Sequence, residues 1–128
     1  MSIDRGDILY SEAFPDIEHG KFFVVIGEND DELVGFFFIN SRISFVNVGA
    51  KRQALQVEMT PDKYSFLHHV SYLDCASLRK IRKDLLESEV LNGTTIRKGR
   101  LKNGDIELVL EKVRASDIYS AIDKDFFI

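Results

Sequence analysis

The chain has one cysteine, no long apolar run and no excess of positive charge, and each of these absences excludes a class of protein. A single cysteine, Cys75, forms neither an intramolecular disulfide nor a metal site built from several cysteines. The longest apolar run, residues 33–39, is far shorter than the roughly 20 residues that cross a bilayer as a helix. The sequence opens with MSIDRGD rather than with a basic and then apolar leader, so we expect a protein of the reducing cytoplasm without a membrane partner.

Charge and size set two further limits. Lys and Arg number 17 against 21 Asp and Glu, a net charge of -4, so no chain-wide field attracts a phosphate backbone. Nucleic acid would have to be bound by a local patch. With 128 residues, of which 45% are hydrophobic, the whole chain, 1–128, is predicted to form a single domain with its own core.

Segments rich in Val, Ile, Phe and Tyr are separated by turn residues and predict five or six β-strands. They are residues 7–14, 22–27, 33–43, 55–60 and 70–73. Residues 22–26 and 36–39 are apolar on both faces of a pleated strand, so we expect two central strands covered on both sides and joined by a turn at 28–32. Residues 55–60 alternate between apolar and polar, which is typical of a strand near a sheet edge.

After residue 74 the hydrophobic residues recur at helical spacing, with Arg and Lys between them, and predict an amphipathic helix with a basic outer face. Its apolar positions are Leu78, Ile81, Leu85 and Leu86. A second helix is predicted over 103–114, with Asn103 as its N-cap. Between the two helices we expect a turn and a short extended piece at 94–96, and the tail, 117–128, is expected to add a helical turn.

Five short motifs follow one another along this pattern. They are GDIL at 6–9, GKFFVVI at 20–26, FINS at 38–41, SYLDC at 71–75 and KGRL at 98–101. In order and spacing, these motifs and the elements around them resemble the PemK/MazF ribonuclease toxins over nearly the whole chain. The resemblance implies an α+β fold, in which a small, strongly curved antiparallel β-sheet of the SH3-like barrel type carries C-terminal helices.

The same resemblance implies a toxin of a toxin-antitoxin pair that cleaves single-stranded RNA without a metal or other cofactor, through attack by the RNA's own 2′-hydroxyl. Where the family has a phosphate-stabilising Arg and then a Pro, this chain has Lys21 and no proline, and a lysine supplies charge without a bidentate fork. The family's Thr or Ser matches Ser41, and the amide of Asn40 before it can donate to a phosphate oxygen. Where some members carry an Arg beside an Asp, the chain has Tyr72 and Asp74.

The histidines and the cysteine are further candidates for chemistry. In a strand, His68 and His69 would point to opposite faces, so one of them, with His69 as our candidate, would serve as a general base near neutral pH. Alternatively, the pair flanks a turn at the surface. No HxH or HExxH spacing occurs, and His19 is interpreted as part of a solvated loop, so no metal site is expected. Asp74 is interpreted as a backbone cap, and Cys75 as a small buried residue.

Two basic clusters interrupt the acidic composition, one at 79–83 and one at 97–102. Our candidates for contacts to RNA, besides Asn40, are Arg79, Lys80, Arg97 and Lys98. Single-stranded RNA would also need an aromatic side chain for stacking, such as Tyr72 or Phe45. The alternative is an ordinary solvated helix face and a solvated loop.

These observations leave several hypotheses open. The leading one is an RNA-engaging PemK/MazF-like protein, an endoribonuclease with Lys21, Ser41 and His69 around the scissile phosphate. The alternative is a non-catalytic module of the same fold that binds a protein or peptide, such as an antitoxin-like segment. A phage or mobile-element protein that acts in an assembly is the third, and a homodimer stays open in each case.

Overall fold

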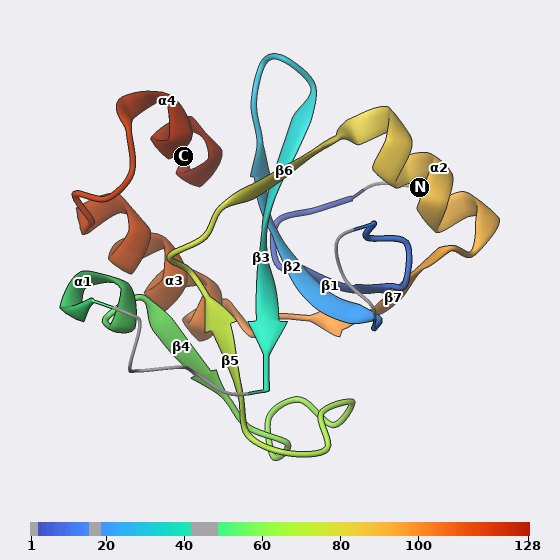
Figure 1. Ribbon diagram of the computed structural model, residues 1–128, viewed down its shortest axis with the longest axis horizontal. Helices are drawn as coiled ribbons and strands as arrows, with labels where there is room; N and C mark the ends of the chain where they lie inside the picture. The colour runs from blue at the N-terminus through green and yellow to red at the C-terminus, as the bar shows by residue number, and fades with distance from the viewer. Residues whose placement is uncertain (1–2, 16–18, 42–48) are drawn as a thin grey trace.

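The computed structural model describes residues 3–15, 19–41 and 49–128. In these ranges the chain forms a seven-stranded antiparallel sheet with helices around it (Figure 1). The strands are β1 (Asp7–Ser11), β2 (Lys21–Glu28), β3 (Leu33–Asn40), β4 (Gln56–Met59), β5 (Ser71–Asp74), β6 (Arg79–Arg82) and β7 (Thr95–Arg100). The helices are α1 (Ala50–Gln53), α2 (Lys83–Asn92), α3 (Asn103–Ala115) and α4 (Ala121–Lys124), with a 3-10 turn, η1 (Asp125–Phe127), after α4. The predicted α+β class is confirmed.

The central hairpin of β2 and β3 carries the core. The two strands pair antiparallel, with Phe23 opposite Phe38 and Val24 opposite Phe37. Val24 and Phe37 face one apolar cluster that includes residues of α3 and η1, while Phe23 and Phe38 face a second cluster that includes Leu86 of α2. Figure 1 accordingly shows α3 and α4 on one side of the hairpin and α2 on the other. The prediction of two central strands covered on both sides is therefore confirmed.

The remaining strands extend the sheet in the order β4-β5-β3-β2-β1-β7, and β6 pairs with β3 off this path. β4 stands at one end of the order, as the alternation at 55–60 predicted. β1 ends at Ser11, short of the predicted end at residue 14, and the predicted continuation of β3 over 42–43 lies outside the described residues. β4 and β7 do not pair with each other in the described ranges, so the sheet is open there and closure into a barrel is not seen.

The helix predicted over 78–86 is wrong in its first half. Its basic residues at Arg79–Arg82 form β6, and α2 follows directly. β5 pairs with β3 at Ile39 and Asn40, which leaves the other half of β3 with an open edge, and β6 pairs with that edge over 33–36. Unpaired backbone groups beside a buried strand are costly, so the strand pairing prevails over the helical spacing. The predicted basic helix face is instead the surface of an edge strand.

β7 and α3 follow the prediction with two differences. The short extended piece expected at 94–96 is the six-residue strand β7, which pairs with β1. The helix predicted over 103–114 is confirmed as α3, but its N-cap is Lys102 rather than Asn103, and no side chain of the cap residue accepts a hydrogen bond. The Tyr64 hydroxyl, 3.1 Å away, accepts the backbone N–H of Lys102, so a residue from outside the helix satisfies this donor.

The tail forms the predicted helical turn and closes one side of the core. α4 begins after Ser120, whose hydroxyl accepts a hydrogen bond from the backbone N–H of Asp123 at 3.1 Å. The η1 turn then buries Phe126 and Phe127 completely. Gly35 of β3 allows this close packing, because a Cβ at that position would lie 2.7 Å from a ring carbon of Phe126.

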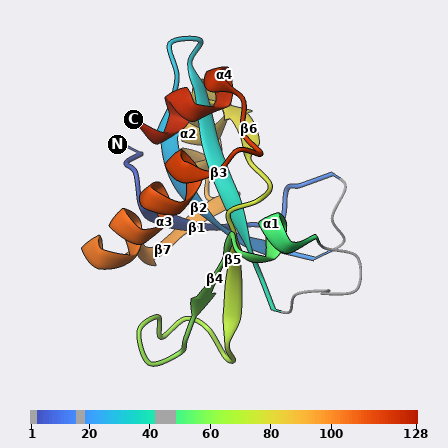
Figure 2. The same cartoon turned by 90° about the vertical axis from the view of Figure 1, so that its left-hand side faces the viewer.

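Figure 2 shows the hairpin of β4 and β5, with its connecting loop, extending below the rest of the sheet. This loop lies beyond the end of β3 and carries the two adjacent histidines (Figure 1). Within the ranges that the structure describes, no helix combines the length and the apolar character needed to cross a membrane.

Candidate functional site

A pocket of about 460 Å³ lies at the end of the central hairpin, where β2 begins and β3 ends. The loop between β4 and β5 forms its other wall. The lining residues are His19, Gly20, Lys21, Phe22, Ile39, Ser41, Phe66, Leu67, His68, His69 and Ser71. We call it the histidine pocket, because all three histidines of the chain line it. The three residues predicted to be catalytic, Lys21, Ser41 and His69, thus meet in one place from three segments of the chain.

Lys21 lines the pocket at the start of β2, and its ammonium is held by the end of β3. Its ammonium donates to the side-chain oxygen of Asn40 and, at 3.4 Å, to the backbone carbonyl of Ile39. It also lies 5.3 Å from the centre of the Phe38 ring, a cation-π contact. Burial lowers the pKa of Lys21, while nearby Asp74 raises it. Since the oxygen of the Asn40 amide accepts from Lys21, its NH₂ group is oriented to donate elsewhere.

The histidines lie in loops and not in a strand. His68 and His69 are exposed and precede β5, which begins at Ser71, so the strand in which they would point to opposite faces does not include them, and the interpretation as a surface pair beside a turn describes them. The hydroxyl of Ser71 donates to the backbone carbonyl of His69 at 3.1 Å and holds that part of the loop. His19 is exposed, as expected for a solvated loop, and it also lines the same pocket, which its sequence neighbours did not predict.

These histidines are not arranged as a metal site. In the described part of the chain, no group of three or more His, Cys, Asp or Glu side chains is placed to hold a metal ion. Imidazoles that line a pocket without being grouped around a metal position are suited to proton transfer.

Two aromatic rings form the apolar wall of the pocket. Phe22 of β2 and Phe66 of the β4-β5 loop pack with their ring centres 4.9 Å apart, and both are partly buried. A base of a nucleic acid can stack on such rings. Neither phenylalanine was among the predicted stacking residues. Of those, Tyr72 lies on β5 opposite Asn40, outside the set that lines the pocket, and Phe45 lies outside the described residues.

Asp74 and Cys75 have the structural roles that the sequence indicated. Asp74 accepts hydrogen bonds from the backbone N–H of Ala76 at 3.2 Å and from the amide of Gln56 at 2.8 Å, so it fixes the turn after β5. It does not cap a helix, because β6 follows this turn. Cys75 is fully buried, and burial raises the pKa of its thiol far above the usual range, which excludes it as a nucleophile at neutral pH.

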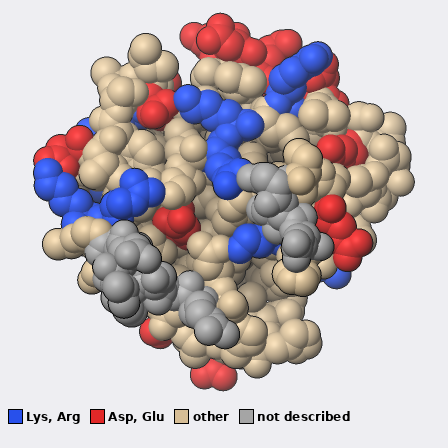
Figure 3. Space-filling model, viewed as in Figure 1, with Lys and Arg blue, Asp and Glu red and all other residues tan. Residues whose placement is uncertain are grey.

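The basic residues of β6 separate into two roles. The guanidinium of Arg79 lies 4.6 Å from the centre of the Phe38 ring, the same ring that Lys21 contacts. Lys80 instead forms an ion pair with Asp123 at 2.7 Å and lies over the ring of Phe126. Figure 3 shows Lys and Arg side chains gathered in the upper middle of this molecular face, at the place of β6 in Figure 1. Arg79 lies outside the set that lines the histidine pocket and lines a separate hollow beside Phe36, whereas Lys80 holds the tail.

The predicted cluster on β7 is separated from β6, because β3, β2 and β1 lie between these strands. Arg97 forms an ion pair with the buried carboxylate of Asp7 at 3.0 Å, and Arg100 binds the same carboxylate at 3.2 Å. Lys98 lies 5.9 Å from the centre of the Tyr10 ring. The two predicted basic clusters therefore do not form one continuous patch.

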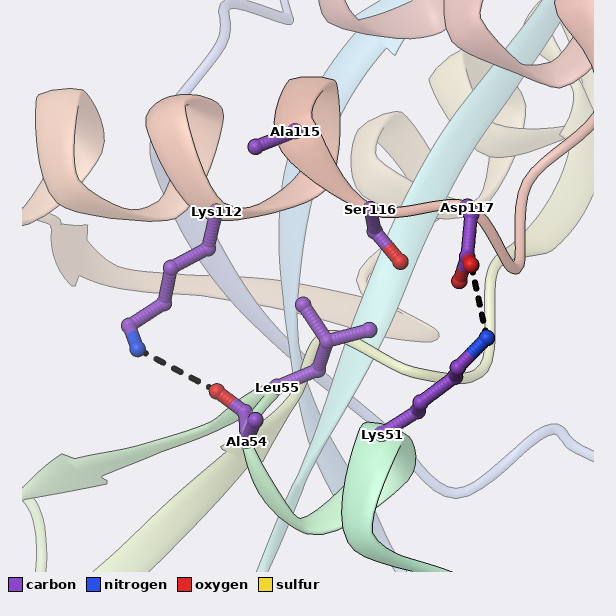
Figure 4. A pocket seen from close by; sticks show the side chains of 7 residues that line it. All are labelled: Lys51, Ala54, Leu55, Lys112, Ala115, Ser116 and Asp117. Atoms are coloured by element: carbon purple, nitrogen blue, oxygen red, sulfur yellow. Dashed lines mark hydrogen bonds and ion pairs between the residues drawn. The ribbon is translucent and has the colours of Figure 1, made fainter.

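A second cavity, of about 470 Å³, lies between α1 and the end of α3 (Figure 4). Lys112 donates to the carbonyl of Ala54 at 3.1 Å, and Lys51 pairs with Asp117 at 2.6 Å, so both lysines at its rim bind protein groups. None of the predicted site residues lines it. The histidine pocket is therefore the better candidate site, because it combines three histidines and an aromatic wall with a lysine in its lining.

Comparison with known proteins adds no relative to this picture. No model of a protein family matches the chain, and no curated protein matches it in sequence. The resemblance to PemK/MazF toxins therefore depends on the motifs and their order alone.

Proposed function

We propose that the protein binds single-stranded RNA in the histidine pocket and cleaves it without a metal ion, as a divergent PemK/MazF-like toxin whose open sheet is a variant of their SH3-like barrel. The observation that carries this proposal is the convergence of Lys21, Ser41 and all three histidines on one pocket. Imidazole is the side chain best suited to proton transfer near neutral pH. Several imidazoles beside a fixed lysine therefore suit acid-base cleavage of a phosphodiester.

The reaction needs a base and an acid. His69, in its neutral form, accepts the proton of the RNA 2′-hydroxyl while the 2′-oxygen forms a bond to phosphorus. The bond between phosphorus and the 5′-oxygen breaks, and a protonated imidazole, His19 or His68, gives its proton to that oxygen. The products are a 2′,3′-cyclic phosphate and a 5′-hydroxyl, and no water or external cofactor is consumed.

Positive charge stabilises the phosphorane-like transition state. The ammonium of Lys21 is held by Asn40 before RNA binds, so little reorganisation is needed. The amide NH₂ of Asn40 and the hydroxyl of Ser41 donate to the non-bridging oxygens. Arg79, over the same Phe38 ring as Lys21, supplies a second positive charge and offsets the family arginine that the chain lacks.

The test is cleavage of a single-stranded RNA in EDTA. We expect wild-type protein to yield products that end in a 2′,3′-cyclic phosphate, and a substrate with 2′-deoxyribose at the cleavage position to be resistant. His69→Ala should lower the rate by about 100-fold or more, the usual contribution of a general base, and Lys21→Ala by a similar factor. Lys51→Ala is the matched control, because its exposed ion pair lies at the other cavity.

The outcomes separate catalysis from binding. Cleavage that persists in both His69→Ala and Lys21→Ala, with folded protein by circular dichroism, would refute the assignment of the site. Salt-sensitive RNA binding that Lys21→Ala weakens, without cleavage by any variant, would leave an RNA-binding relative that has lost the chemistry. Absence of both binding and cleavage at low salt would reject the RNA function.

A second candidate, a non-catalytic module that binds a protein or peptide, is favoured by the free edge of β6. β6 pairs with β3 through one edge, and in the described ranges no strand pairs with its other edge. An extended peptide can add to such an edge as a further strand, and the basic side chains at Arg79–Arg82 favour an acidic peptide. Tight binding of an acidic peptide, lost when residue 81 becomes proline, together with no RNA binding, would establish this candidate in place of the first.

A further inference from the structure

Three aromatic side chains form a row that leads to the histidine pocket. Tyr10 of β1 lies directly opposite Phe22 of β2 in the strand register, and the centres of the two rings are 4.9 Å apart. Phe22 in turn lies 4.9 Å from Phe66 of the β4-β5 loop. The row thus crosses two strands and ends at two rings that line the pocket.

The row differs from the aromatic core of the protein by its exposure. Phe23 and Phe37, on the same central strands, are at most 1% exposed, whereas Tyr10, Phe22 and Phe66 are only partly buried. A partly buried ring leaves surface for a second aromatic group to stack on, which a core ring cannot offer.

The end of the row away from the pocket carries a cation. Lys98 of β7 lies 5.9 Å from the centre of the Tyr10 ring. The pairing of β1 and β7 is irregular at this point: Ile8 pairs with Gly99 and Leu9 with Arg97, so Lys98 has no partner in β1. This is the geometry of a β-bulge, a device that re-aims a side chain. The bulge places the ammonium of Lys98 over the row, while Arg97 binds Asp7.

The backbone between the row and the pocket is closely fitted. Gly20 lines the histidine pocket, and a Cβ at this position would lie 1.8 Å from the hydroxyl oxygen of Tyr10. Any larger residue would displace the tyrosine. The first ring of the row therefore packs against the pocket wall itself.

We propose that the row of Tyr10, Phe22 and Phe66 is a stacking track for consecutive bases of single-stranded RNA, with Lys98 bound to a backbone phosphate at its outer end. This proposal rests on the proposed function, because the track delivers the strand to the histidine pocket. Every base has a π-face, so the track reads no sequence. It sets the length of RNA that the protein prefers, since only a strand longer than the pocket reaches Tyr10 and Lys98.

The test compares the binding of a dinucleotide with that of an octanucleotide, both fully 2′-O-methylated so that neither is cleaved. We expect wild-type protein to bind the octanucleotide more tightly. Tyr10→Leu should weaken octanucleotide binding at least about fivefold, as expected for the loss of one base stack, and leave dinucleotide binding unchanged, whereas Tyr10→Phe should retain wild-type affinity. Lys98→Gln should weaken octanucleotide binding and lower its log-log salt slope by about 0.7, the value for one phosphate of a single strand.

Lys51→Gln is the control for loss of one surface charge, because Lys51 lies at the other cavity. If Tyr10→Leu and Lys98→Gln bind the octanucleotide as wild type does while Lys21→Ala does not, the track is refuted and the proposed function stands. If the wild-type protein binds neither oligonucleotide at low salt, both proposals fail. If Tyr10→Leu does not fold, as judged by its thermal transition, the Lys98→Gln variant decides the question alone, because Lys98 is exposed.

Discussion

The hydroxyl of Tyr64 joins the β4-β5 loop to the start of α3, and its removal gives a sharp test of this architecture. Tyr64 is 4% exposed. Its hydroxyl donates to the carboxylate of Asp105 at 2.5 Å and accepts the backbone N–H of Lys102 at 3.1 Å. Tyr64→Phe keeps the ring and removes both hydrogen bonds. A hydrogen bond to a charged group contributes about 1.5–3 kcal/mol, so we expect a loss of about 2 kcal/mol in the free energy of unfolding at pH 7.

The pH dependence of this loss is specific to the mechanism. Burial, together with the hydrogen bond to Asp105, raises the pKa of Tyr64 from 10.0 to about 12. A pKa raised in the folded state stabilises the protein fully below pH 10, and this contribution is lost as the pH rises through about 12. Two pKa units correspond to at most about 2.7 kcal/mol of stability. Asp105 also pairs with the half-exposed Lys63, and water screens the charges there, so the contribution of Tyr64 is smaller than this upper value.

The assay is urea denaturation of wild type and Tyr64→Phe at several pH values from 7 to 12. Lysines and arginines titrate in both proteins, so the difference in the free energy of unfolding isolates Tyr64. We expect this difference to stay near 2 kcal/mol up to pH 10 and to shrink toward zero at pH 12. Tyr72→Phe, at a half-buried tyrosine of β5, is the control. A difference that does not change with pH would refute the assignment of the hydrogen bonds.

Three further outcomes are expected. Gly35→Ala should lower the free energy of unfolding in urea by about 1–3 kcal/mol, because the new methyl group overlaps the Phe126 ring. Gly104→Ala, in the first turn of α3, meets open space and should raise it by up to about 1 kcal/mol. Equal effects of the two variants would contradict the packing of Gly35 against Phe126. Cys75 should react with a thiol reagent only when the protein unfolds, so rapid labelling of native protein would show that the thiol is accessible. Asp7→Ala should lower the midpoint of urea denaturation, because the buried carboxylate binds two arginines of β7, and an unchanged midpoint would show that these ion pairs contribute nothing.

The central hairpin was predictable because its signal is local. Residues 22–26 and 36–39 are apolar at every position and rich in Val, Ile and Phe, a pattern typical of a strand covered on both faces. The α3 helix was predictable for a similar reason, since Val109, Leu110 and Val113 are the buried residues of a regular helical stripe.

The strands β6 and β7 could not be predicted in the same way, because their reason to form lies elsewhere in the chain. Ile81 fits a strand as well as a helix, and the open edge of β3 decides between them. In β7 only Thr95 is buried, so the strand has no apolar alternation and depends on backbone pairing with β1. A strand held by backbone pairing rather than by buried side chains shows no apolar alternation in its sequence.

The candidate site was predictable where a motif fixed a position and not where contacts had to be known. Lys21 and Ser41 follow from the order of motifs, and the structure places both at the histidine pocket. His19 reaches that pocket through the fold, since nothing near it in the sequence signals its role. Charge counting also fails to separate Arg79, which contacts the same ring as Lys21, from Lys80, which is paired with Asp123.

The resemblance to the PemK/MazF toxins places Lys21 where those toxins have an arginine, and the neighbours of this position suit a lysine. The face of the Phe38 ring is a limited surface for cations, and the planar guanidinium of Arg79 already lies 4.6 Å from its centre. The smaller ammonium of Lys21 fits between this ring and the amide oxygen of Asn40. Burial lowers the pKa of Lys21 and Arg79 lowers it further, while Asp74 opposes both. Because Lys21 of β2 and Arg79 of β6 contact the same ring, this end of β3 carries two positive charges, and the proposed RNA function does not require an arginine at position 21.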